Sequence, residues 1–114
     1  MTSEQLTRAF AEAVIAQNRC IEKGDARAGN RHAKVYVSAG KQLLANGEAG
    51  IEVFCSLLSH PSSAVRVAAA AVLLKSRTEQ AVATLRPIAQ GRGLSALEAQ
   101  MTLERYERGE REIT

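Results

Sequence analysis

The sequence predicts an all-α protein of about six helices, stacked as antiparallel hairpins in a short right-handed α-α superhelix. Three observations lead to this prediction. Apolar residues recur with a helical period along the 114-residue chain, and no stretch alternates as a strand does. Gly, Asn-Gly and Pro separate the periodic stretches. The connectors are short, so we expect one domain over residues 1–109, followed by a frayed tail at 110–114.

The first predicted helix spans residues 3–23. Thr2 followed by Gln5 is typical of a capping box, and Gly24 is typical of a glycine just past a helix end. Helical spacing predicts one buried stripe, which consists of Leu6, Phe10, Ala13, Val14 and Ile21.

The second predicted helix spans residues 25–45, with Asp25 as its N-cap and Asn46-Gly47 as its stop. The face that we expect to be buried consists of Ala33, Val37 and Leu44, bordered by Tyr36, Gly40 and Leu43. Gly40 costs about 1 kcal/mol relative to alanine in mid-helix. We therefore expect it to allow the close approach of a neighbouring backbone.

The third helix is predicted over residues 48–59 and the fourth over 61–74. The buried face of the third consists of Ile51, Phe54, Cys55 and Leu58. His60-Pro61 separates the two helices, because the residue before proline is pushed out of helical geometry. The fourth helix is apolar on nearly every side from Ala64 onward, so we expect it to be the central helix of the domain.

The last two helices are predicted over residues 78–90 and 95–108. Gly91 to Gly93 form the loop between them. Ser95 is the expected N-cap of the sixth helix, with Glu98 at the capping-box position, and Gly109 is its expected end.

Composition excludes several classes of protein. Apolar residues make up 46% and charged residues 24%, which are ordinary values for a globular domain and too apolar for intrinsic disorder. The longest apolar run covers residues 67–74, far short of the roughly 20 residues that a spanning helix needs. With no export signal recognised, we expect a cytoplasmic protein in which Cys20 and Cys55 are free thiols.

The basic excess is thin and evenly spread. The formal net charge is +3, with seven Lys/Arg against six Asp/Glu in residues 1–60 and eight against six in residues 61–114. Aromatic residues make up 4% and tryptophan is absent, so platforms for base stacking are scarce. We do not expect nucleic acid as a partner.

The stretch around Val65-Arg66 resembles the corner between the two helices of a HEAT repeat. Residues 59–69 give a short polar turn, then Val-Arg, then an Ala pair. HEAT repeats usually place an acidic residue before the Val-Arg pair, whereas this chain has Ser62, Ser63 and Ala64. The resemblance implies a short HEAT-like stack of hairpins without the ladder of aspartates between repeats.

The whole chain is similar to a family of small bacterial proteins described as a domain of unknown function. The shared features are Gly24-Asp25, Asn30-Arg31, the Val65-Arg66 corner and a final helix ending at Gly109. The resemblance implies a HEAT-like superhelix and no established activity.

One helix face carries the strongest candidate for a binding site. Arg27, Arg31, Lys34 and Lys41 follow at i, i+4, i+7 and i+14, and no acidic residue lies between Asp25 and Glu48. This pattern predicts either a docking face for an acidic protein or a solvated helix surface. Arg66 is expected either to join this face or to brace the turn before its own helix.

No catalytic, cofactor or metal site is predicted. His32 has no carboxylate within four positions along its helix, and His60 precedes a proline in a turn. The two histidines and two cysteines lack the spacing of a metal site. Cys20 and Cys55 both fall in apolar helical patterns, which favours packing over reactivity.

We therefore predict a non-enzymatic protein-interaction module, either a monomer or a homodimer. The apolar faces of the first and last helices are candidate dimer surfaces, because a short solenoid leaves both ends open. A toxin-neutralising immunity protein is the second hypothesis, by analogy at the level of the fold. A small enzyme with an unrecognised site is the third.

Overall fold

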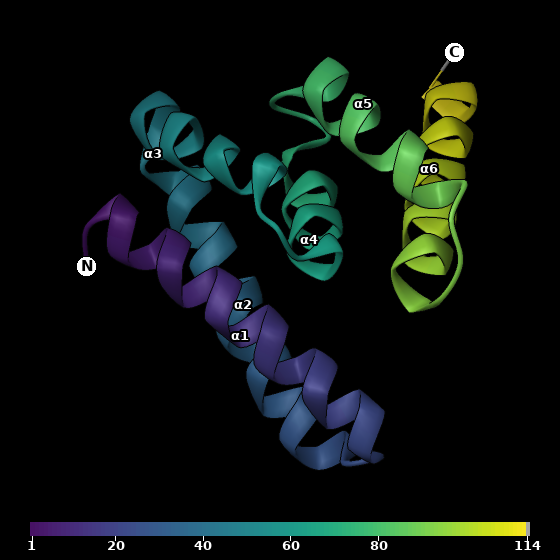
Figure 1. The fold of residues 1–114 in the computed structure, drawn as a ribbon. Helices are drawn as coiled ribbons and strands as arrows, with labels where there is room; N and C mark the ends of the chain where they lie inside the picture. Colours follow the sequence, from purple (N-terminus) through teal and green to yellow (C-terminus); the bar gives the residue numbers. More distant parts are fainter. Residues whose placement is uncertain (114) are drawn as a thin grey trace.

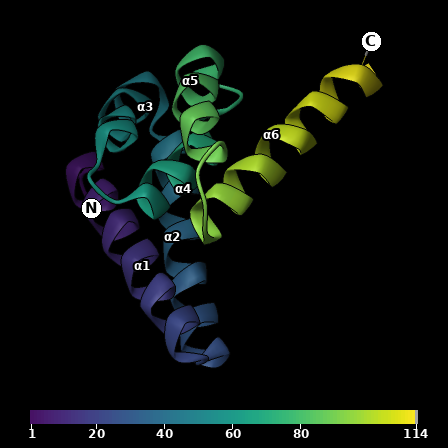
Figure 2. The ribbon, with the colours of Figure 1, turned by 45° about the vertical axis from the view of Figure 1, so that its right-hand side comes forward.

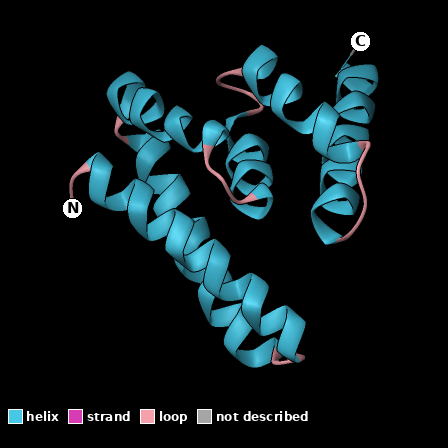
Figure 3. Ribbon diagram, viewed as in Figure 1, coloured by secondary structure: helices cyan, strands magenta, loops and turns pink. Residues whose placement is uncertain are grey.

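The computed structural model describes the backbone of residues 1–113 and the side chains of residues 1–109. Within this part of the chain, all regular structure is helical (Figure 3). The six α-helices are α1 (Ser3–Lys23), α2 (Ala26–Ala45), α3 (Gly47–Phe54), α4 (Ser63–Leu73), α5 (Thr78–Ala89) and α6 (Leu94–Ile113). A short 3₁₀ helix, η1 (Cys55–Ser59), follows α3. The prediction of an all-α fold with about six helices is confirmed.

The helix ends follow the caps read from the sequence. The Thr2 hydroxyl accepts a hydrogen bond from the Gln5 backbone N–H at 3.1 Å, and the Gln5 side chain accepts from the Thr2 N–H at 2.8 Å. Gly24 ends α1 with φ of 74°, and the Asp25 carboxylate accepts from the Ala28 N–H. These local contacts confirm both ends of α1 and the start of α2.

Several helix ends differ from the prediction. The fourth helix begins at Ser63, after the N-cap Ser62, and not at Pro61. The third helix tightens to 3₁₀ geometry after Phe54, where the Ser56 hydroxyl donates to the Val53 carbonyl before the chain reaches Pro61. Ser95 lies inside α6 instead of capping it, because the helix already begins after Gly93, whose φ is 95°. The backbone of α6 continues through Gly109 to Ile113. The predicted frayed tail at 110–114 falls outside the residues whose side chains are described.

Helices that follow one another along the chain pack together, with α4 in the middle. The main contacts join α1 with α2, η1 with α4, α4 with α5, and α5 with α6 (Figure 1). Helix α4 also contacts α1 and α6, and it buries Val65, Ala69, Ala70 and Leu73. The prediction of a central fourth helix is confirmed, although Ala71 on its surface is exposed.

The far halves of α1 and α2 form a two-helix arm that projects from the rest of the domain (Figures 1 and 2). Every buried residue of α1 lies within its first twelve residues; these residues are Leu6, Thr7, Phe10, Ala11, Ala13 and Val14. Ile21 was predicted to be buried and is 46% exposed. This prediction was wrong because only α2 covers α1 along the arm.

The buried side of α2 is rotated from the predicted one. The structure buries Ala39, Gly40 and Leu43, whereas Val37 is 45% exposed. The cause is the packing around Gly40. A Cβ there would lie 3.4 Å from the Phe10 ring and 3.7 Å from the methyl carbons of Val72. Gly40 therefore makes room for side chains of α1 and α4, and not for a backbone as predicted.

The turn before α4 is held by Arg66. Its guanidinium donates to the carbonyl oxygens of His60 at 2.7 Å and Pro61 at 3.1 Å, and to the Ser63 hydroxyl at 3.0 Å. His60 Nδ1 accepts from the Ser62 N–H at 3.0 Å. Of the two roles predicted for Arg66, the structure shows the bracing role.

Replacing Arg66 with alanine is expected to lower the free energy of unfolding by about 1–2 kcal/mol, because the part-buried His60 carbonyl and the exposed Pro61 carbonyl lose a charged donor. Lysine should recover little of this, since it lacks the planar fork that reaches three acceptors. Urea unfolding followed by circular dichroism at 222 nm measures both values. If Arg66→Lys is as stable as the wild type, positive charge alone holds the turn.

Candidate functional site

The candidate docking surface is the outer face of α2, formed by Arg27, Arg31, Lys34 and Lys41. All four side chains are exposed, as the sequence predicts. Their spacing places them on one side of the helix, opposite the buried Gly40 and Leu43. We call this set the α2 basic face.

No described acidic side chain neutralises the α2 basic face. The only described ion pairs join Arg77 to Glu48 and to Glu52. The Asp25 carboxylate is used by the helix cap, where it accepts from the Ala28 N–H at 3.1 Å. The four cations therefore present a concentrated positive charge at the surface, even though the net charge of the whole chain is only +3.

The α2 basic face also has an apolar element. Val35 and Val37 are 50% and 45% exposed, although the sequence reasoning assigned Val37 to the core. Val37 lies in a shallow hollow of about 390 Å³ whose rim includes Lys34 and Lys41. A partner surface with carboxylates around a small apolar side chain would complement this arrangement.

Arg66 lies on α4 and is engaged with the turn before that helix. Its guanidinium bonds to the turn that precedes α4, as described above, and the side chain is only partly exposed. The proposed docking face is accordingly reduced to the four residues on α2.

His60 and Cys55 take part in the packing and hydrogen bonding of the fold. His60 is tied into the turn before α4 through its Nδ1 atom. Burial is the main cause that raises the pKa of the Cys55 thiol, and Glu52 and Glu48 raise it further against the opposing effect of Arg77. A raised thiol pKa lowers the thiolate fraction at neutral pH, which makes Cys55 a weak nucleophile. The part of the chain that the structure describes contains no cluster of metal-ligating side chains.

Tyr36 on α2 lies within the electrostatic influence of Glu98 on α6, which the sequence reasoning did not anticipate. Burial first, and the negative charge of Glu98 second, raise the pKa of the Tyr36 phenol, while a hydrogen bond with Gln17 opposes the shift. Burial likewise raises the pKa of the Glu98 carboxyl. Because Ser95 lies inside α6, Glu98 does not form the predicted capping box with it.

The exposed side of α6 carries a row of apolar residues. Leu94, Leu97 and Met101 follow at i, i+3 and i+7 and are 41%, 52% and 48% exposed. The opposite side buries Ala96 and Ala99. This row adds to the candidate dimer surface expected on the last helix, and the oligomeric state stays a prediction.

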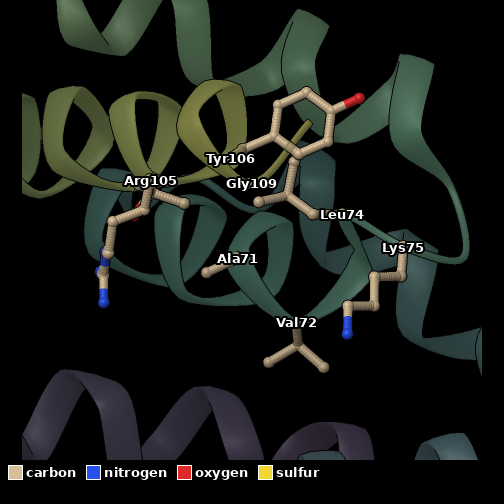
Figure 4. Close-up of a pocket in the computed structure, with 8 residues that line it drawn as sticks. Ala71, Val72, Leu74, Lys75, Arg105, Tyr106 and Gly109 are labelled. Atoms are coloured by element: carbon tan, nitrogen blue, oxygen red, sulfur yellow. The ribbon is translucent and has the colours of Figure 1, made fainter. Parts of the chain in front are cut away.

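A groove between α4 and α6 is the second hollow of interest (Figure 4). Its volume is about 550 Å³, and its lining includes Ala71, Val72, Leu74, Lys75, Arg105 and Tyr106. The lining is mostly apolar, with one cation from each side. Sequence reasoning missed this groove because Lys75 and Arg105 are far apart along the chain.

Comparisons with known proteins support the fold. The sequence matches no protein-family model and no curated protein. The structure is similar to the crystal structure of the protein RPA1889 from Rhodopseudomonas palustris CGA009, with a TM-score of 0.89 and 24% identity. The match covers 96% of this chain and 91% of that chain. It shows that a bacterial protein has the same helical fold, while the HEAT-like superhelix stays a prediction.

None of the described helices is long and apolar enough to cross a membrane.

Proposed function

We propose that this protein is a non-enzymatic interaction module that binds an acidic protein partner through the α2 basic face. One observation carries the proposal: four exposed cations share a helix face on which no described acid pairs with them. The exposed Val37 between Lys34 and Lys41 adds an apolar contact to the charged ones. Charge complementarity of this kind speeds association and selects partners.

The proposal also covers how the helices are arranged and where in the cell the protein acts. The helices form a short HEAT-like solenoid, supported by the packing of consecutive helices and by the bracing arginine at the corner before α4. The compartment is the cytoplasm, supported by two free cysteines, Cys20 and Cys55.

Reversing two charges of the α2 basic face should weaken partner binding by about tenfold or more, because both lost attraction and new repulsion act at the interface. The variant is Arg31→Glu with Lys34→Glu. A photo-crosslinking residue at Val37 identifies the acidic partner in native lysate, and calorimetry with the purified partner then measures the dissociation constant.

The matched control is Arg86→Glu with Arg92→Glu, which changes the net charge equally at two exposed positions outside α2. This control should bind within about threefold of the wild type, since distant surface charges act weakly at moderate salt. If both double variants lost affinity for the partner equally, the effect would come from the net charge of the protein and not from the α2 basic face. Unchanged binding by the α2 variant would refute the assigned surface.

A further inference from the structure

The groove between α4 and α6 has an apolar floor that no described side chain fills. Ala71 is exposed on α4, and its small side chain leaves space above it in the groove. On the α6 side, a Cβ at Gly109 would have no neighbour within 4 Å. The hollow therefore results from small residues on both helices.

Two cations border this floor from different helices. Lys75 follows α4 and Arg105 lies on α6, and both side chains are exposed. In Figure 4 their charged ends lie on opposite sides of Ala71 and Val72 and extend toward the same side of the groove. No described carboxylate forms an ion pair with either of them.

We propose that this groove docks an amphipathic helix of a protein partner, whose apolar side chains contact Ala71 and Val72 and whose bordering carboxylates pair with Lys75 and Arg105. An apolar groove between two helices is a recurrent site for such segments. A lone carboxylate would reach one of the two separated cations, whereas a helix with acidic residues along both borders reaches both. The surface is distinct from the α2 basic face, so either proposal can fail alone.

The probe is a fluorescein-labelled synthetic helix of 18 residues, with leucines along one face and glutamates on both borders of that face. Fluorescence anisotropy with the full-length protein measures its affinity at low salt. We expect saturable binding, and at least about tenfold weaker binding when the glutamates become lysines or the leucines become alanines.

Two variants locate the binding site. Ala71→Leu fills the floor from an exposed position, and the pair Lys75→Glu with Arg105→Glu reverses the border charges without touching the core. Each should weaken probe binding by about tenfold or more. The pair Arg31→Glu with Lys34→Glu is the control, and it should bind the probe as the wild type does. Circular dichroism and thermal unfolding verify that all variants are folded.

Three results would overturn the proposal. The first is full affinity for the probe in both groove variants. The second is loss of probe binding in the α2 control alone, which would assign the binding of acidic helices to the α2 basic face. The third is an absence of probe binding together with Ala71-dependent binding of decanoate, which would assign the groove to a small amphipathic anion.

Discussion

Replacing Phe10 with alanine is expected to lower the free energy of unfolding by about 3–5 kcal/mol. The Phe10 side chain is fully buried and packs edge-to-face against Phe54, with ring centroids 4.9 Å apart, and against Tyr36 at 5.4 Å. These rings join α1, α2 and α3, so the cavity would open where three helices meet. The total stability of a domain this size is of the order of 5–15 kcal/mol, so the loss would be a large fraction of it.

Urea unfolding followed by circular dichroism at 222 nm measures the Phe10→Ala effect. Phe10→Leu retains an apolar side chain and should cost less than the alanine variant. Ile21→Ala is the exposed control on the same helix, and its effect should stay within about 0.5 kcal/mol because the arm leaves that side chain half exposed. If the free energy of unfolding of Phe10→Ala lay within 1 kcal/mol of the wild-type value, the three rings would not be what holds the helices together.

The features predicted correctly from the sequence depend on neighbours along the chain. The capping box at Thr2 and the cap at Asp25 need only residues three positions away. The exposure of four cations on one side of α2 was predicted correctly for a similar reason, because spacing on one helix fixes which side chains share a side. Arg66 also acts within six residues, and bracing was one of the two roles foreseen for it.

The features that were missed depend on how helices meet. Hydrophobic spacing put Val37 in the core, but the packing partners of α2 lie beside Gly40, and a glycine adds nothing to a hydrophobic pattern. Ile21 fits the buried stripe of α1, yet its exposure depends on how far the hairpin extends past the body of the domain (Figure 2). The α4–α6 groove requires α4 and α6, which are far apart along the chain, to pack side by side, and no local pattern encodes that packing.

A second large effect is expected from Gly50→Ala, at a position that no sequence pattern singled out. A Cβ at Gly50 would overlap the carbonyl oxygen of Leu43 and lie 2.8 Å from the Asn46 Cβ. The obstacle is the backbone of α2 and not the end of a flexible side chain, so α3 would have to move away from α2. We expect a loss of about 3 kcal/mol in the free energy of unfolding, the upper part of the usual range for overpacking.

Gly40→Ala is the matched control for this substitution, because both glycines are buried and helical. At Gly40 the nearest atom to a new Cβ is a Phe10 ring carbon at 3.4 Å, which is ordinary contact, and alanine gains up to about 1 kcal/mol in helix propensity. The free energy of unfolding of Gly40→Ala, measured in urea, should therefore lie within about 1 kcal/mol of the wild-type value. If the two variants lose equal stability, the corner between α2 and α3 is no tighter than ordinary helix packing. If only Gly50→Ala is destabilised, this corner is where the chain brings two backbones together.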